Sequence, residues 1–159
     1  MNNKIAFIAL FIILLLVNWS IVKKEQQLAT GRLVYLQLAP VDPRSLMQGD
    51  YMRLRFDITS KIVKDMAPET KDAFVIVTLD DKKVASYKGI YSNEKSLADN
   101  EMALQFRVRQ KTVKFATNSF FFQEGRAGEF NSARFAQFRV NDKGELLLVA
   151  MFNKHLIKI

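Results

Sequence analysis

Residues 51–58 read YMRLRFDI, and this stretch decides the fold class of the chain. Apolar and polar side chains alternate along it, which is the period of a β-strand with one buried face. The apolar face carries Met52, Leu54, Phe56 and Ile58. The opposite face carries Tyr51, Arg53, Arg55 and Asp57. We therefore predict a strand over Tyr51–Ile58, with one face in a core and the other in solvent or against a ligand.

Further strand-like segments lie on both sides of this stretch. They are Leu33–Leu38, Ala73–Leu79, Val84–Tyr91, Met102–Arg109, Val113–Ala116, Ser119–Phe122, Arg134–Val140 and Glu145–Phe152, with His155–Ile159 as a candidate last strand. The polar turns Asp80–Lys83 and Asn141–Gly144 predict two β-hairpins, because Asn, Asp and Gly readily adopt the left-handed conformations of hairpin turns. The pattern predicts about eight or nine short strands.

Other segments interrupt the strands. Ala39–Gln48 contains two prolines, so we expect a loop that cannot continue a sheet ladder. Thr59–Met66 is predicted to be a short helix that ends near Pro68. Glu124–Ser132 is predicted to be a short helix or an ordered loop, limited by its glycines. The fold class predicted from these elements is mainly β: a single small β-barrel-like or sandwich domain with one or two short helices.

The N-terminal run Ile5–Val22, IAFIALFIILLLVNWSIV, has 18 residues and no charge. As a helix it spans about 27 Å, close to the thickness of a bilayer core. A cleaved signal peptide is the alternative, but the small residues Ala29 and Gly31 lie too far beyond the apolar run for the usual processing site. We predict a retained anchor with Trp19 near the membrane interface. The chain then divides into a tail (1–4), a transmembrane helix (5–22), a stalk (23–32) and a β-rich domain (33–159).

The charges that flank the anchor bear on its orientation in the membrane. The positive-inside rule sets Lys4 and the amino terminus against Lys23, Lys24 and Arg32, and taken alone it slightly favours a cytoplasmic domain.

Composition narrows the classes of partner. The chain has 24 Lys and Arg against 16 Asp and Glu, a formal charge of +8, which suits an anionic partner. Without Lys4, Lys23 and Lys24 the charge falls to about +5, and this argues against nucleic acid. The chain has no cysteine, which excludes disulfides, thiolate zinc sites and iron–sulfur clusters. We expect no metal and no cofactor.

Candidates for catalysis are few. The one histidine, His155, lies near the C-terminus, so a Ser-His-Asp triad would depend on an insecure part of the chain. Ser45 precedes Gly49-Asp50 in a segment similar to one in membrane-anchored signal peptidases. There the nucleophile lies farther upstream, where this chain has Val41, and no lysine on an apolar strand would serve as its base. We therefore predict no catalytic residue, with a Ser/Lys hydrolase as an alternative.

Charged side chains give a second alternative. Four arginines on predicted strands are candidates for binding anions, with Lys111 beside them: Arg53, Arg55, Arg107 and Arg109. They could form a basic sheet face near the membrane that binds anionic lipid headgroups or a polyanion. Such rows are more often simply solvated. Glu124 is expected to form a surface ion pair with Arg126 or Arg134.

Two segments resemble the bacterial GDYXXLXY protein family. The first is GDYMRLRF, in which Gly49, Asp50, Tyr51 and Leu54 match the string that names the family and Phe56 replaces its final Tyr. Phe56 lies on the apolar face, so this position needs a ring for packing. The second is Phe120–Phe152, an aromatic strand followed by Glu124-Gly125, a connector, Ala133-Arg134 and a strand pair around a Gly turn. We interpret all these motif residues as structural; Gly49 permits a positive φ and Asp50 accepts backbone N–H bonds.

The resemblance implies a membrane-anchored protein whose domain lies outside the cytoplasm, often accompanied by a polytopic membrane protein. It therefore favours a periplasmic domain, against the charge count. The leading hypothesis is a non-enzymatic, single-pass protein of the bacterial inner membrane. Its partners would be the lipid bilayer and a polytopic membrane protein, with anionic headgroups as the alternative ligand.

Overall fold

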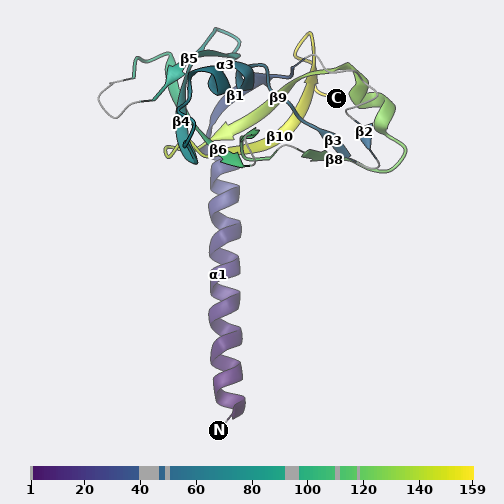
Figure 1. The fold of residues 1–159 in the computed structure, drawn as a ribbon. Helices are drawn as coiled ribbons and strands as arrows, with labels where there is room; N and C mark the ends of the chain where they lie inside the picture. The colour runs from purple at the N-terminus through teal and green to yellow at the C-terminus, as the bar shows by residue number, and fades with distance from the viewer. Residues whose placement is uncertain (1, 40–46, 49–50, 92–96, 110–111, 118) are drawn as a thin grey trace.

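A long helix carries a β-rich domain at its C-terminal end (Figure 1). The structure is a computed structural model, and it describes residues 2–39, 47–48, 51–91, 97–109, 112–117 and 119–159. Helix α1 (Asn2–Thr30) continues without a break through the predicted stalk and ends just before β1. From Lys4 to Thr30 it is long and apolar enough to cross a membrane, and its most apolar window is not covered by the domain.

In the part of the chain that the structure describes, the domain contains three antiparallel sheets. The first has the order β1-β9-β10, from Arg32–Gln37, Ala133–Val140 and Leu146–Asn153. The second has the order β5-β4-β6-β7, from Ala85–Ile90, Asp72–Leu79, Glu101–Arg109 and Thr112–Lys114. The third has the order β2-β3-β8, from Met47–Gln48, Tyr51–Arg53 and Ser119–Phe121. The described residues also form two short helices, α3 (Ile58–Asp65) and the 3-10 helix η1 (Ala127–Ser132).

Single β-bridges connect these sheets into a curved wall. Tyr35 in β1 bridges Val84, just before β5, and Leu38 bridges Phe56. Helix α3 lies on the side of the domain away from α1 (Figure 1) and buries Ile62. The wall encloses one core, whose fully buried side chains include Val34, Leu36, Val75, Val77, Leu104, Phe106, Phe138 and Met151. The predicted mainly β, barrel-like fold behind an apolar helix is confirmed.

The predicted strand Tyr51–Ile58 is only partly a strand. Its alternation is as expected, because Met52, Leu54, Phe56 and Ile58 are all buried. However, the ladder of β3 ends at Arg53, since its partner β8 has only three paired residues. The chain then leaves that sheet: the N–H of Asp57 donates to the carbonyl of Gln37 at the end of β1 (3.0 Å). Ile58 already begins α3. The segment therefore connects two sheets, and a period-2 pattern cannot reveal such a change of partner.

Other expectations can be compared element by element. The hairpins around Asp80–Lys83 and Asn141–Gly144 are confirmed as β4-β5 and β9-β10, and the short helix before Pro68 is confirmed as α3. The predicted loop Ala39–Gln48 is wrong at its end, where Met47–Gln48 pairs with β3; residues 40–46 lie outside the described part of the chain. The predicted last strand is wrong as well. Only Lys158 bridges Phe152, because a turn with Leu156 at a positive φ interrupts the segment.

Candidate functional site

The junction between α1 and the domain is built around a buried glutamine. Gln27 is only 6% exposed. Its Nε2 donates to the carbonyl of Arg139 (3.1 Å) and to that of Glu145 (2.8 Å), more than 100 residues further along the chain. In return, Nη1 of Arg139 donates to the carbonyl of Gly31 (3.0 Å). Buried polar groups are normally paired in this way, and the pairing fixes the end of the helix against β9 and β10.

Gly31 allows the close approach that this junction requires. Its N–H donates to the carbonyl of Gln27 (2.9 Å). A Cβ at this position would lie 2.4 Å from that same carbonyl oxygen and 3.2 Å from Cβ of Arg139. No side chain fits there without a backbone shift. The small residue that could have mimicked a processing site therefore has a structural reason to be glycine.

The turn of the β9-β10 hairpin connects the junction to the four-stranded sheet. Gly144 has a φ of +76° and accepts a hydrogen bond from the N–H of Gln105 in β6 (2.9 Å). A Cβ on Gly144 would lie 2.7 Å from the carbonyl oxygen of Ala103. One turn thus contacts α1 through the Glu145 carbonyl and β6 through Gly144. It joins the helix to two of the three sheets.

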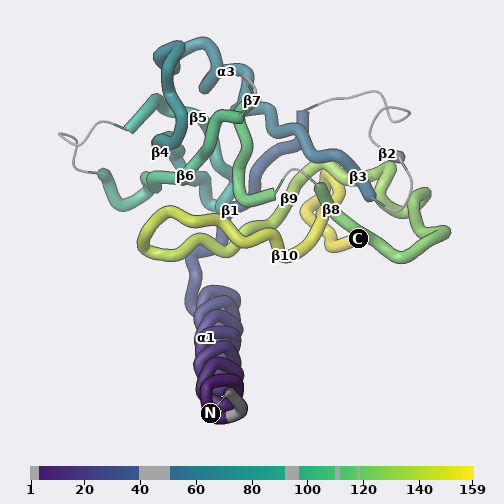
Figure 2. Tube along the Cα trace, turned by 60° about the horizontal axis from the view of Figure 1, so that its bottom comes forward, coloured from purple at the N-terminus to yellow at the C-terminus, as the bar shows by residue number. Residues whose placement is uncertain are grey.

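A groove of about 460 Å³ lies beside this junction. Three cationic side chains line it: Lys24 from α1, Arg107 from β6 and Lys114 from β7. Arg107 and Lys114 are opposite each other in the β6-β7 ladder, and both are exposed. Figure 2 shows β10 and β8 on the face of the domain that lies toward α1, and both strands contribute to the groove.

The remaining lining combines apolar side chains with polar residues such as Gln105 and Ser119. Its main apolar side chains are Phe115, Phe120, Phe121, Leu146, Leu147 and Leu148. Phe121 is 73% exposed, which is unusual for a ring. The one carboxylate of the lining, Glu145, accepts a hydrogen bond from Nδ2 of Asn141 (2.7 Å). The groove thus combines an excess of positive charge with an apolar wall.

The candidate anion-binding residues do not form one row. Of the four arginines only Arg107 lines the groove. Arg109 lies two residues further along β6, where Nη2 is 3.4 Å from the Asp72 carboxylate. Arg53 and Arg55 are exposed in β3 and in the extended segment after it, and Lys111 lies outside the described residues. The predicted sheet face is therefore divided between separate elements.

The motif GDYMRLRF contributes to packing. Leu54 is 1% exposed and Phe56 is 2% exposed. The Phe56 ring packs edge-on against Phe115 and Phe138, at centroid distances of 5.5 and 5.7 Å. The Tyr51 ring lies 5.7 Å from that of Phe121. Gly49, Asp50 and Ser45 lie outside the described residues, so the hydrolase alternative stays a prediction without geometry.

Comparison with known protein families finds the family that this motif names. A family model described as "GDYXXLXY protein" matches residues 13–151, from within α1 to β10. The chain belongs to the GDYXXLXY family. No curated protein and no solved structure matches it.

The second segment that resembles the GDYXXLXY family forms a corner around η1. Its centre is Phe130, which is 5% exposed and lies 5.2 Å from Phe120 and 4.9 Å from Phe122. In the connector before it Gly125 has a φ of +84°, while Glu124 is exposed. After η1, Ala133 is buried, and Arg134 donates to the carbonyl of Asn131 (3.2 Å). The packing of Phe130 against Phe120 and Phe122 therefore forms the interior of this corner.

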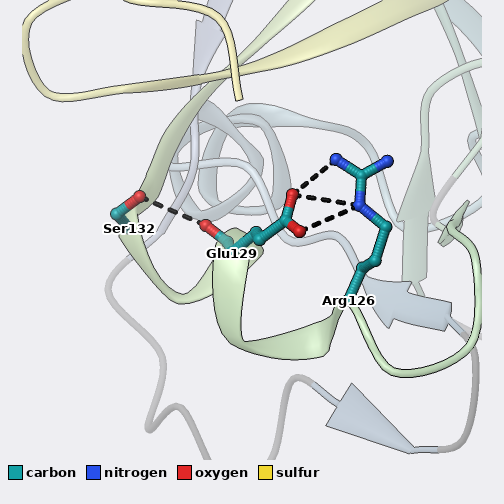
Figure 3. A network of polar contacts seen from close by, with 3 residues as sticks. All are labelled: Arg126, Glu129 and Ser132. Carbon is teal, nitrogen blue, oxygen red and sulfur yellow. Dashed lines mark hydrogen bonds and ion pairs between the residues drawn. The ribbon is translucent and has the colours of Figure 1, made fainter.

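The polar contacts of the corner lie on its surface (Figure 3). Arg126 pairs with Glu129, and not with Glu124 as expected, because the i,i+3 spacing in η1 brings the two side chains together. The ion pair lowers the pKa of Glu129 and raises that of Arg126. Ser132 Oγ donates to the carbonyl of Glu129 (3.3 Å).

The sequence did not predict that Gln27, Lys24 and Lys114 lie in one region. Gln27 sits in a charged stretch that is typical of a solvated stalk, and nothing in its local pattern predicts burial. Lys24 falls in the predicted stalk (23–32), and Lys114 falls in the predicted strand Val113–Ala116. Only the tertiary structure brings them together. His155 is exposed in the C-terminal turn, and the described residues contain no group of three or more His, Asp or Glu suited to a metal.

Proposed function

We propose that this GDYXXLXY-family chain is a single-pass protein of the bacterial inner membrane that works without catalysis. Helix α1 would cross the bilayer, and the β domain would lie on the extracytoplasmic side. There the domain would assemble with a polytopic membrane protein. The proposal rests on the junction between helix and domain.

The observation that carries it is the pairing of Gln27 with the carbonyls of Arg139 and Glu145. A domain that only needs to stay near a membrane can hang on a flexible linker. Here the helix enters the domain with a buried, hydrogen-bonded end, which sets the height and tilt of the domain above the bilayer. A partner in the same membrane also has a fixed height. A pre-oriented domain loses less orientational freedom when it binds such a partner.

The surface of α1 agrees with this role. Its apolar side chains point outward all round, and Leu10, Leu14 and Ile21 are all at least half exposed. Asn18 turns one of its polar groups back onto the helix, because Nδ2 donates to the carbonyl of Leu14 (2.8 Å). The helix therefore offers lipid or a neighbouring helix a smooth apolar surface, suited to van der Waals packing.

A C-terminal reporter fusion tests the orientation. Alkaline phosphatase fused after Ile159 should be active in cells, because it folds only outside the cytoplasm, whereas a fluorescent protein that matures only in the cytoplasm should be dark. The reverse pair of results would contradict the extracytoplasmic assignment, and would favour what the charge count alone suggests.

Co-purification tests the assembly and its dependence on the junction. The full chain, purified from membranes in mild detergent, should retain a polytopic protein. Four Gly/Ser residues inserted between Gly31 and Arg32 should reduce the recovered partner at least tenfold while the chain stays in the membrane fraction. The matched control carries the same four residues after Ile159 and should recover the partner in full. Equal recovery with both insertions, or a solitary monomer without any, would contradict the proposal.

A further inference from the structure

We propose that the groove lined by Lys24, Arg107 and Lys114 binds the phosphate headgroup of an anionic phospholipid from the membrane that α1 crosses. The inference rests on the proposed membrane anchoring and is independent of any protein partner. It assigns a ligand class to a site that the sequence did not indicate as one unit.

The charges of the groove suit a phosphate. Its three cations come from three separate elements, and Arg107 and Lys114 are opposite each other in the β6-β7 ladder. The ion pairs recorded among the described residues use other cations: Lys88, Arg109 and Arg126. The carboxylate of Glu145 is already hydrogen-bonded to Asn141. The lining therefore carries three cations against one carboxylate. Arginine and lysine side chains in such an excess are common ligands of phosphate oxygens.

The position of the groove suits a lipid. Lys24 follows the apolar run Ile5–Val22 after a single residue, so its ammonium group lies at headgroup depth when α1 crosses the bilayer. Its Nζ is 3.2 Å from Oε1 of Gln27, the residue that fixes the helix to the domain. The groove is lined by Lys24 of α1 and by residues of β8 and β10. These two strands lie on the face of the domain toward α1 (Figure 2). A headgroup could therefore enter it without leaving the bilayer surface.

The apolar wall favours a phospholipid over a free phosphate. Phe121 lines the groove and is 73% exposed, and Leu147 and Leu148 continue the wall along β10. A free phosphate ion gains nothing from such surface. The glycerol and upper acyl carbons of a lipid would cover it and remove it from water. A groove that combines cationic side chains with an exposed ring matches an anionic amphiphile.

Native mass spectrometry of the full chain in detergent tests this assignment. Phosphatidylglycerol should remain bound at concentrations where phosphatidylcholine does not. The double variant Arg107→Gln, Lys114→Gln should weaken phosphatidylglycerol binding at least tenfold, because each juxtamembrane cation contributes severalfold to binding an anionic lipid. The matched control Arg109→Gln, Lys61→Gln removes the same charge outside the groove and should change binding less than twofold.

Several outcomes would overturn the inference. Equal losses in the two double variants would show a general charge effect in place of a site. Equal binding of phosphatidylcholine would exclude recognition of the anion. Competition by inorganic phosphate at the concentration of the lipid would show a free-anion site in place of a lipid site.

One outcome would separate this inference from the proposed assembly. A groove variant that loses the lipid but still recovers the protein partner would support the lipid site while leaving the proposed assembly intact.

Discussion

Gln27 at the junction and Arg126 at the η1 corner each make several hydrogen bonds, but in different surroundings. Gln27 is 6% exposed and binds carbonyls 112 and 118 residues away. Arg126 binds a side chain three residues away, and the two side chains are 49% and 48% exposed. Exposed ion pairs contribute little because water already solvates both charges. For a part-buried carbonyl that loses its donor, water is a poorer substitute. We expect polar contacts to stabilise the junction and apolar contacts to stabilise the corner.

The largest effect should come from removing the ring beneath the corner. Phe130→Ala deletes a side chain that is 5% exposed and contacts Phe120 and Phe122, so we expect a loss of about 3–5 kcal/mol in the free energy of unfolding. Urea unfolding of the full chain in detergent measures it. Phe121→Ala, which removes a ring that is 73% exposed, is the control and should cost far less. Similar losses for both rings would mean that Phe130 does not anchor the corner.

A methyl group at the junction should have the next largest effect. In Gly31→Ala the new Cβ would lie 2.4 Å from the carbonyl oxygen of Gln27, and backbone must move to admit it. We expect a loss of about 1–3 kcal/mol and faster hydrogen exchange in residues 27–31. Gly128→Ala is the control at the corner, because a Cβ there meets no atom within 4 Å. If the two alanines behaved alike, the junction would not be tightly packed.

Removing the buried amide should then separate polar from steric effects at the junction. Gln27→Ala leaves the carbonyls of Arg139 and Glu145 without this donor, which typically costs about 1–3 kcal/mol. Hydrogen exchange should quicken in the β9-β10 turn. The neighbouring Gln26→Ala changes an exposed side chain of the same type and should leave both measurements unchanged. Water entering in place of the amide would reduce the effect toward that of the control.

The sequence predicted the hairpins well because their information is local. In β9 and β10 each strand alternates, and Asn141–Gly144 supplies the turn between them. The strand over Tyr51–Ile58 was predicted too long because its alternation reports burial, and the same buried face continues while the partner changes from β8 to the end of β1. Burial has a local signal, but the identity of the neighbour does not.

The candidate site shows the same limit more strongly. Arg107 was predicted from its outward position on a strand, and it does line the groove. Arg109 has the same local pattern but lies beside Asp72, which precedes it by 37 positions. Lys24 and Lys114 belong to the groove only because the β9-β10 turn draws α1 against the sheets. No periodicity within one segment contains that information.

The contact of Tyr87 is intermediate between those of the junction and the corner. It joins two separate elements, as at the junction, but it lies near the surface, as at the corner. Its hydroxyl donates to the Asp65 carboxylate of α3 (2.6 Å), and burial together with that bond raises the pKa of Tyr87 from about 10 to about 12. A group whose pKa is raised on folding stabilises the fold fully below pH 10, and this contribution is lost as the pH rises toward 12. Absorbance titration should show a late-ionising tyrosine that disappears in Tyr87→Phe. Asp65→Asn should lower the pKa of Tyr87; an unchanged late titration would contradict the contact.

The smallest effect should come from the ion pair on the corner. Glu129→Gln removes the charge that Arg126 holds, and both side chains are about half exposed, so the unfolding midpoint at neutral pH should not change measurably. The pKa of Glu129 is lowered in the fold, so what little stability the pair provides is present above the carboxylate's ordinary pKa and disappears as the pH falls through its lowered value. Wild type and Glu129→Gln should therefore have the same midpoint at acid pH as well as at neutral pH. If Glu129→Gln destabilised the chain as much as Gln27→Ala, solvent exposure would not explain how much each polar contact stabilises the fold. The difference between the junction and the corner would then have to depend on the geometry of their hydrogen bonds.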